Sequence, residues 1–311
     1  MNFVYFGKGL RGAYCLEKLL ENNYFPSLVI SQNDNLKLIE PMCSKYDIPF
    51  MFSPTNINSE EMINLLKDFK PELFVLSGFS QILHDEILSL PSLGAINLHG
   101  GKLPEYRGAS VINWQIINGE TEGGCSIIRV NNSKIDFGDI LIQETYRITY
   151  YDTAETIYKK TLPIFSDMLL YKMKELSTGG TLIYGGKKQS THEGKYYCKR
   201  YPRDSQIFWE NMTSKNVYDL VRAMNGPDLP PAYSFLKIKD ETYKIEIIEV
   251  EEMGETIVGP YGRVALKRKN GVVVICKDKG ILIKKIKLGD EIISATYFLN
   301  SGGYTFHKRD E

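Results

Sequence analysis

The chain lacks the features that mark several large classes of protein. Only five of its 311 residues are cysteine, and they stand far apart with no Cys-x-x-Cys pair. This scatter indicates neither a disulfide framework nor a zinc site, and reduced thiols in a cytoplasmic protein explain it most simply. No apolar run approaches the roughly 20 residues that cross a membrane, and no signal peptide opens the chain. The sequence therefore predicts a cytoplasmic protein without a membrane partner.

An excess of charge of either sign is absent as well. The chain holds 38 basic and 38 acidic residues, so no global field would attract nucleic acid. A hydrophobic content of 43% and a charged content of 24% are typical of soluble globular proteins. The length is sufficient for two domains, each with its own core.

The first 180 residues alternate between short apolar strands and amphipathic helices. This alternation predicts an α/β fold with a Rossmann-like, doubly wound and mostly parallel sheet that carries helices on both faces. We predict one domain over residues 1–180. Its strands are predicted at 2–6, 27–30, 48–52, 73–77, 95–99, 125–130 and 140–149, and its helices at 13–21, 38–46, 59–69, 111–118 and 153–176.

The remainder of the chain has a different pattern. Residues 181–203 are polar, irregular and contain glycine, as is typical of an interdomain linker. Beyond them, a helix at 214–224 precedes short alternating strands, which predict a small β-rich, OB-like barrel domain over residues 204–311. The strands are expected at 233–238, 244–249, 263–268, 271–276 and 280–287.

The stretch from Ala95 to Gly108 contains the most informative residues. Asn97 and His99 alternate with apolar residues, so both side chains leave the same face of a strand near its carboxyl end. α/β enzymes build their sites at such strand ends. A hydrogen-bonded Asn–His pair of purely structural role would give the same pattern. Asp136, in a loop before a later apolar strand, favours a site because it can return to the same strand ends.

The segment from Gly7 to Gly12 joins the first strand to the first helix. A glycine-rich turn at a helix N-terminus can hold an anion, and Lys8, Gly9 and Arg11 favour a phosphate. Any tight strand-to-helix connection gives the same pattern, so both interpretations stay open.

The segment from Phe79 to Leu83 follows the fourth predicted strand. Phe79, Ile82 and Leu83 are apolar and would line a crevice for a flat aromatic ligand beside the fifth strand. Packing in the core explains the same residues equally well.

Together these residues resemble the formyltransferase family that uses 10-formyltetrahydrofolate. Its members include methionyl-tRNA formyltransferase, glycinamide ribonucleotide formyltransferase and enzymes that act on nucleotide-linked amino sugars. The resemblance covers about residues 1–200. The matching residues are Asn97-Leu98-His99, Leu103-Pro104-Glu105-Tyr106-Arg107-Gly108, Trp114, Asn118-Gly119-Glu120-Thr121 and Asp136-x-Gly138-Asp139-Ile140.

The C-terminal region resembles, more loosely, the barrel appended to the tRNA and aminoarabinose-type enzymes, through Asp204-Ser205 and Phe208-Trp209. The central motif departs from the family at two places. Gly101-Lys102 stands where a serine and an apolar residue are usual, and Val111 stands where proline is common. These departures leave the catalytic residues intact but weaken any inference about the branch of the family.

The resemblance implies that Asn97, His99 and Asp136 are catalytic. Asn97 would donate an N–H to the developing oxyanion, a contribution on the order of 3 kcal/mol. His99 would move protons, because an imidazole titrates near neutral pH. Asp136 would orient His99 and favour its charged form. The chemistry requires no metal.

The resemblance also assigns binding segments. Folate would contact Phe79, Ser80, Gln81, Ile82 and Leu83. The substrate would approach the side of Lys8, Gly9, Arg11 and Lys102, where its phosphates would be held. Lys102, which departs from the family pattern, is explained equally well as a solvated loop lysine. Arg107 would either bind substrate or brace the loop.

The leading hypothesis is an N-formyltransferase acting on a UDP- or dTDP-linked amino sugar in surface polysaccharide biosynthesis. Asn113-Trp114 resembles the sugar branch more than the tRNA branch. Residues 204–311 hold 16 basic and 16 acidic residues, whereas a tRNA-binding domain is expected to be basic. The expected partners are folate and a nucleotide sugar, with no nucleic acid.

Three alternatives stay open. Lys267-Arg268-Lys269 and the lysines between 277 and 287 suit a methionyl-tRNA formyltransferase. A formyltetrahydrofolate hydrolase would need no amine pocket, and a non-catalytic folate binder would not need all three catalytic residues. The sequence also leaves open whether the C-terminal domain contacts substrate or forms a homodimer.

Overall fold

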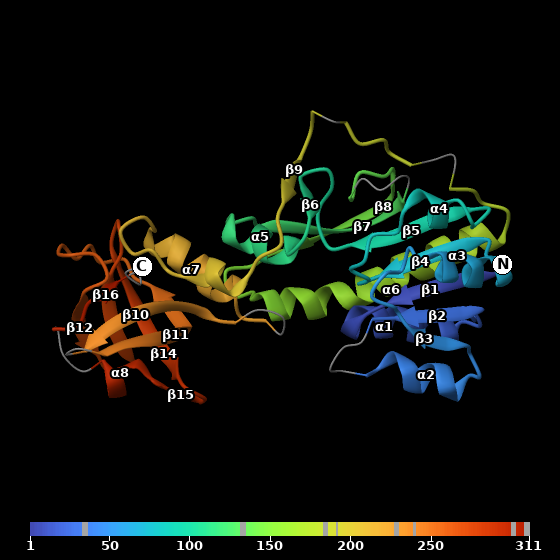
Figure 1. Ribbon diagram of the computed structural model, residues 1–311. Coiled ribbons are helices and arrows are strands. Elements are labelled where there is room, and N and C mark those ends of the chain that lie inside the picture. The colour runs from blue at the N-terminus through green and yellow to red at the C-terminus, as the bar shows by residue number, and fades with distance from the viewer. Residues whose placement is uncertain are drawn as a thin grey trace. The chain divides into compact units, whose positions relative to one another are not determined.

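The computed structural model describes residues 1–32, 37–130, 135–182, 186–190, 192–226, 230–238, 241–299 and 303–307 (Figure 1). The chain forms two compact units. The first unit contains Met1–Val111, Glu122–Arg147 and Tyr158–Tyr197. The second contains Ile112–Thr121, Ile148–Ile157 and Cys198–Glu311. The domain boundaries expected from the sequence, at 180 and 204, stay a prediction.

The first unit is built on a seven-stranded sheet with the order β3-β2-β1-β4-β5-β7-β8. The first five of these strands are parallel, whereas β7 and β8 run antiparallel to their neighbours. The predicted Rossmann-like, mostly parallel sheet is therefore confirmed. The strands are β1 (Phe3–Gly7), β2 (Leu28–Ser31), β3 (Phe50–Phe52), β4 (Leu73–Ser77), β5 (Gly94–His99), β7 (Glu122–Val130) and β8 (Ile140–Arg147).

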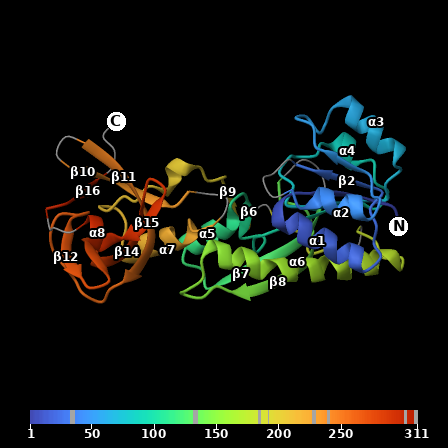
Figure 2. The same cartoon turned by 90° about the horizontal axis from the view of Figure 1, so that it is seen from below.

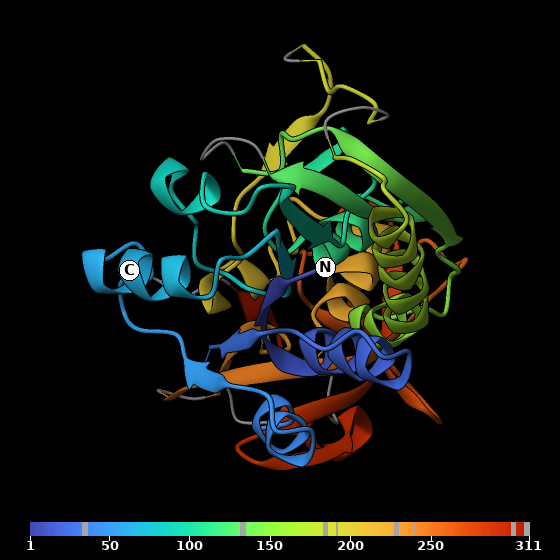
Figure 3. The same ribbon diagram turned by 90° about the vertical axis from the view of Figure 1, so that its right-hand side faces the viewer.

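Helices cover both faces of this sheet, as Figure 2 shows. On one face, α3 and α4 pack their apolar side chains against alternate residues of β1, β2 and β4. On the other face, the Tyr5 hydroxyl donates to Gly12 O of α1 over 2.7 Å. Figure 3 shows α1 beside α6, and Lys18 pairs with Asp167 across them at 2.8 Å. The helices of this unit are α1 (Gly9–Glu21), α2 (Ile39–Lys45), α3 (Glu60–Asp68), α4 (Asp85–Leu88) and, from Tyr158 on, α6 (Ala154–Ser177), whereas α5 (Val111–Ile117) belongs to the second unit from Ile112 on.

Helix α1 begins at Gly9, whereas the sequence pattern predicted its start at Ala13. The glycines after β1 had indicated an open turn. The structure gives Gly12 another role, because a Cβ there would lie 3.1 Å from both Gly7 C and Ser77 O. Its missing side chain lets the first turn of α1 pack closely against the ends of β1 and β4.

The second unit is an antiparallel sheet with the order β12-β13-β14-β11-β10-β16, with β15 paired to β14. Its two ends meet where Arg263 bridges Thr305, so the sheet curls around the core. The predicted β-rich unit is confirmed, although β15 and β16 were too short to predict. Its elements are α7 (Ser214–Ala223), β10 (Ala232–Ile238), β11 (Glu241–Glu252), β12 (Val264–Arg268), β13 (Gly271–Ile275), β14 (Gly280–Leu288), β15 (Glu291–Ser294), α8 (Ala295–Phe298) and β16 (Phe306–His307).

Part of the segment predicted as a linker is ordered against the first unit. Strand β9 (Lys195–Tyr197) pairs in parallel with β6 (Tyr106–Gly108), which lies in the loop after β5. Figure 1 shows the two strands side by side. Within the described part of the chain, no helix is long and apolar enough to cross a membrane.

Candidate active site

Asn97 and His99 extend from the same face of β5 near its carboxyl end, as their spacing predicted. Asn97 Nδ2 donates to Asp136 Oδ1 over 3.4 Å, and His99 Nδ1 lies 3.3 Å from Asp136 Oδ2. The His99 and Asp136 side chains are only 6% and 8% exposed. The structure therefore brings the three predicted catalytic residues together in one nearly buried cluster.

Asp136 occupies a turn with a left-handed backbone, at φ 52°. Few residues adopt this conformation, and aspartate is among the more tolerant of them. Its Oδ2 atom also accepts a hydrogen bond from Gly108 N at 3.0 Å. The carboxylate is thus held by the loop that follows β5 (residues 100–108, the motif loop) as well as by β5.

The His99 ring lies between two acceptors. Its Nε2 atom is 2.6 Å from Tyr106 O, while Nδ1 faces the Asp136 carboxylate. A carbonyl and a carboxylate both accept hydrogen bonds, so a proton on either ring nitrogen of His99 has an acceptor beside it. This arrangement suits a residue that takes up a proton during the reaction and later donates it.

Gly101 allows the close approach of these groups. A Cβ at this position would lie 2.4 Å from Tyr106 O and 2.7 Å from His99 Nε2. The loop is fixed from the neighbouring strands by Ser126, whose hydroxyl donates to Gly101 O at 2.9 Å. Gln143 Oε1 accepts from Leu103 N at 2.8 Å. The sequence pattern had indicated neither Ser126 nor Gln143.

Arg107 is 7% exposed and makes several protein contacts. Its Nε atom donates to Gln189 Oε1 at 2.8 Å, and its guanidinium lies 4.6 Å from the centre of the Phe137 ring. Burial lowers the pKa of Arg107, and the nearby Asp136 carboxylate opposes that shift. Of the two roles expected for Arg107, these contacts fit a brace of the loop.

Lys102 also has a protein partner. Its Nζ atom lies 2.7 Å from Glu122 Oε1, and this hydrogen bond lowers the pKa of the Glu122 carboxyl. Both side chains are at least one-third exposed. An anionic substrate at Lys102 would therefore compete with Glu122.

The predicted phosphate-binding turn lies on the same unit. Lys8 is the extended residue before α1, and Gly9 follows it with φ 62°. The Arg11 guanidinium packs over the Phe165 ring at 4.5 Å. Its NH2 atom would lie 3.1 Å from a Cβ at Gly100, directly after His99. The structure thus brings Arg11 beside that glycine.

The segment predicted to contact folate, Phe79 to Leu83, forms hydrogen bonds with polar side chains from other loops. Ser80 N donates to Gln32 Oε1 at 2.8 Å, and Gln81 Oε1 accepts from Ser53 Oγ at 2.7 Å. Leu83 belongs to the core and is 3% exposed, as the packing alternative expected, whereas Ile82 is 46% exposed.

Phe79, the first residue of this segment, packs edge-on against Phe6, with the ring centres 5.3 Å apart. The preceding strand, β4, pairs with β5 so that Ser77 lies beside Leu98. The segment therefore starts next to the strand end that carries Asn97 and His99.

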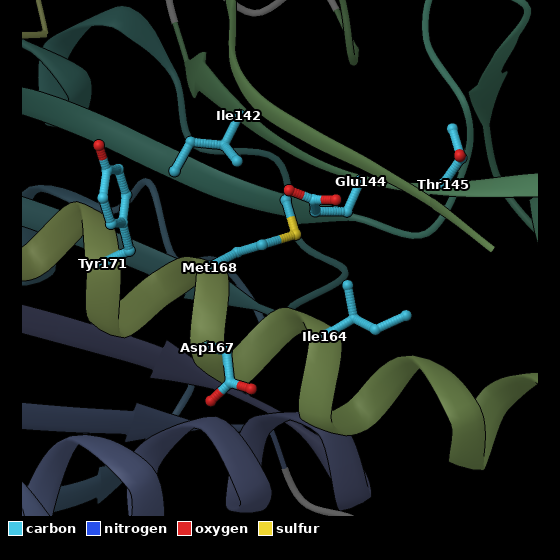
Figure 4. A pocket seen from close by; sticks show the side chains of 7 residues that line it. All are labelled: Ile142, Glu144, Thr145, Ile164, Asp167, Met168 and Tyr171. Atoms are coloured by element: carbon cyan, nitrogen blue, oxygen red, sulfur yellow. The ribbon is translucent and has the colours of Figure 1, made fainter.

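A separate groove of about 490 Å³ lies between β8 and α6 (Figure 4). None of the predicted site residues lines it. Its walls are Ile142, Glu144, Thr145, Ile164, Asp167, Met168 and Tyr171. Among the described residues, no group of three or more His, Cys, Asp or Glu side chains is placed to hold a metal ion.

Comparison with known families gives two matches that together span most of the chain. Residues 1–170 match the formyl transferase model, and residues 200–303 match the model of the formyl transferase C-terminal domain. The matched regions include Asn97, His99 and Asp136 in the first model and most of the β-rich unit in the second.

Two curated relatives are each 32% identical to the chain. One is the bifunctional polymyxin resistance protein ArnA of Wigglesworthia glossinidia brevipalpis, aligned over 95% of this chain and 42% of its own length. The other is the methionyl-tRNA formyltransferase of Clostridium acetobutylicum, aligned over 92% of each chain. The chain thus spans less than half of the first relative and nearly all of the second.

A similar solved structure is an N-formyltransferase from Helicobacter canadensis in complex with folinic acid and dTDP-3-aminofucose. It is 19% identical to this chain, with a TM-score of 0.67, and the alignment covers 91% of this chain and 98% of that one. At this identity the likeness shows a shared fold.

Proposed function

Because the chain belongs to the formyl transferase family, we propose that it moves the formyl group of 10-formyltetrahydrofolate to the amine of a nucleotide-linked amino sugar. In this reaction the amine nitrogen bonds to the formyl carbon, and the bond from that carbon to the folate nitrogen breaks. A proton leaves the new ammonium, and one is delivered to the departing nitrogen. The residues at the end of β5 are suited to these tasks.

Asn97 and His99 supply the polar groups at the reacting carbon. The Asn97 amide donates an N–H toward the oxyanion that develops on the formyl oxygen, a contribution on the order of 3 kcal/mol. His99 accepts the proton of the amine and donates one to the leaving group. Asp136, 3.3 Å from His99 Nδ1, holds the ring and stabilises its charged form.

The segment from Phe79 to Leu83 would hold the folate. It begins beside β5. Its backbone, which is hydrogen-bonded to Gln32, offers polar groups, and the exposed Ile82 side chain offers an apolar surface to a flat ring. When bound there, the folate supplies an activated formyl group. Lys8, Gly9, Arg11 and Lys102 would bind the phosphates of the acceptor, while Arg107 braces the loop.

The choice of a sugar acceptor depends on the charges of the second unit. The lysines of β14 that suggested a tRNA surface are paired with glutamates of β11. Lys284 lies 3.1 Å from Glu249, and Lys285 lies 2.7 Å from the same carboxyl group. Lys287 lies 4.0 Å from Glu246. A protein that binds RNA neutralises phosphates with lysine and arginine, and here the glutamates already neutralise these lysines.

Methionyl-tRNA is the second candidate acceptor. The observation in its favour is the relative from Clostridium acetobutylicum, which aligns with both units over 92% of each chain. The β11–β14 ion pairs are the observation against it, because a tRNA backbone would have to displace the glutamates.

The release of tetrahydrofolate distinguishes these acceptors. The protein is mixed with 10-formyltetrahydrofolate and, in separate reactions, UDP-linked amino sugars, dTDP-linked amino sugars, initiator methionyl-tRNA or no acceptor. We expect release that depends on an amino sugar and is lost in His99→Ala. Release that needs tRNA would show the second candidate to be right, and release without any acceptor would indicate a hydrolase. Folate binding without release would indicate a non-catalytic binder.

A further inference from the structure

The Gln189 side chain forms hydrogen bonds with the left-handed turn that carries Asp136. Gln189 Nε2 donates to Asp136 O at 2.9 Å and to Gly138 O at 2.7 Å. Gln189 Oε1 accepts from Arg107 Nε at 2.8 Å. The amide therefore uses both of its N–H groups on the turn and its oxygen on the motif loop.

The orientation of this amide follows from its partners. The two carbonyl groups of the turn can only accept hydrogen bonds, and the Arg107 guanidinium can only donate them. With the amide reversed, its oxygen would face two carbonyl oxygens and its NH2 group would face the guanidinium. A primary amide is also the side-chain group that offers two donors and one acceptor in this arrangement. The position therefore requires glutamine chemistry, which neither glutamate nor an apolar residue provides.

The backbone next to Gln189 is anchored as well. Lys187 N donates to Ile140 O at 2.8 Å, and Ile140 N donates to Lys187 O at 2.9 Å. This pair ties the segment to the start of β8, directly after the Asp136 turn. Ser190 O accepts from Arg107 NH2 at 3.2 Å. The backbone is thus hydrogen-bonded on both sides of Gln189, at Lys187 and at Ser190.

The same segment also supports the other side of the His99 ring. Strand β9 pairs with β6, and the Tyr197 ring stacks on Tyr106 with the centres 4.7 Å apart. Gly194 passes against Pro104 O so closely that a Cβ would lie 1.8 Å from it. The carbonyl of Tyr106 is the group 2.6 Å from His99 Nε2. Residues 186–190 and 192–197 therefore fix both groups between which His99 lies.

We propose that Gln189 is a positioning residue for formyl transfer, which holds the Asp136 turn so that the carboxylate faces His99. The proposal rests on the function given above, in which Asp136 orients His99. Gln189 acts through the backbone of Asp136 and Gly138 and does not contact substrate. It therefore affects the turnover step and leaves the binding of folate and acceptor unchanged.

Two substitutions at the same position separate the contacts. Gln189→Leu removes all three hydrogen bonds, whereas Gln189→Glu keeps an acceptor for Arg107 and removes both donors to the turn. Ser190→Ala is the matched control, because Ser190 contacts Arg107 through its backbone oxygen, and its hydroxyl accepts an exposed hydrogen bond from His192 N, two residues further on, at 3.2 Å. Steady-state kcat and KM for both substrates are measured with the acceptor that the wild-type protein uses, together with the Kd for folate and the thermal midpoint.

We expect Gln189→Leu and Gln189→Glu each to lower kcat about 10- to 100-fold, the range expected when two ordinary hydrogen bonds to the turn are lost. Both KM values and the folate Kd should change less than about threefold, and Ser190→Ala should match the wild type. If Gln189→Leu fails to fold, Gln189→Glu decides the question alone.

Wild-type kcat in Gln189→Glu would overturn the proposal, because the contact to Arg107 would then suffice. A rise in KM at unchanged kcat would also overturn it, because Gln189 would then be a binding residue. In both cases the wild-type activity, and hence the proposed function, would stand. A wild-type protein that transfers formyl to no acceptor would refute the proposed function and, with it, this role of Gln189.

Discussion

Replacing Asp136 with asparagine should nearly abolish turnover without unfolding the protein. The Asp136 carboxylate accepts from Gly108 N and Asn97 Nδ2 and lies 3.3 Å from His99 Nδ1. Asparagine has one acceptor oxygen. If that oxygen stays on Gly108 N, the new NH2 group faces the NH2 of Asn97; if the amide flips, it faces Gly108 N–H. Either orientation sets two donors against each other.

The size of the effect follows from these contacts. A buried donor left without an acceptor costs about 1–3 kcal/mol, and a lost hydrogen bond to a charged group about 1.5–3 kcal/mol. Because about 1.4 kcal/mol corresponds to a tenfold change in rate, the two together predict a decrease in kcat of about 10²- to 10⁴-fold.

The assay is the release of tetrahydrofolate under saturating substrates, with thermal unfolding as the test of integrity. Asp139→Asn makes the same chemical change in the same loop and serves as the control. Asp139 contributes a backbone carbonyl, which accepts from Arg129 N at 2.9 Å. We expect Asp139→Asn to retain wild-type kcat. Asp136→Asn with more than about one-tenth of wild-type kcat would refute the catalytic role of the carboxylate.

Two further predictions concern stability. Asp219→Ala should lower the free energy of unfolding of the second unit by about 3–5 kcal/mol in urea titrations. The substitution leaves the buried Arg222 guanidinium, which lies 2.8 Å from Asp219, without its carboxylate. A change below about 1 kcal/mol would contradict this. Hydrogen bonds from Lys285 and then Lys284 lower the pKa of the Glu249 carboxyl. A lowered folded-state pKa contributes stability above the unfolded pKa, and this is lost as the pH falls through the folded value. The thermal midpoints of wild type and Glu249→Gln should therefore differ near pH 7 and converge as the pH falls through the lowered pKa of the folded-state carboxyl, whereas a difference that grew in acid would contradict the ion-pair assignment.

The periodicity of β5 was sufficient to predict that Asn97 and His99 share a face, because strand geometry alone fixes that relation. The alternation of strands and helices likewise predicted a mostly parallel sheet. The direction of β7 and β8 could not be predicted, since an apolar run has the same pattern in either direction. The two-residue strand β16 was too short for any periodic signal.

The supports of the site were not predictable from local patterns. Gln189 contacts a turn 53 residues earlier in the chain, and it lies in a segment whose composition indicated a linker. Ser126 and Gln143 lie within apolar strands, where a polar residue gives no sign of its partner. Arg107 is in the central motif, but its sequence position could not distinguish a brace from a substrate contact. These contacts depend on tertiary structure, which brings distant residues together.

The most direct test of the central claim is to follow the formyl carbon itself. The protein is incubated with 10-formyltetrahydrofolate labelled with ¹³C in the formyl group and with a dTDP- or UDP-linked amino sugar, and the products are separated and examined by mass spectrometry and carbon NMR. We predict that the label appears as an N-formyl group on the amino sugar with wild-type protein and is absent with His99→Ala. Label recovered only as free formate, or only on methionyl-tRNA when that is supplied beside the sugar, would contradict the proposed function.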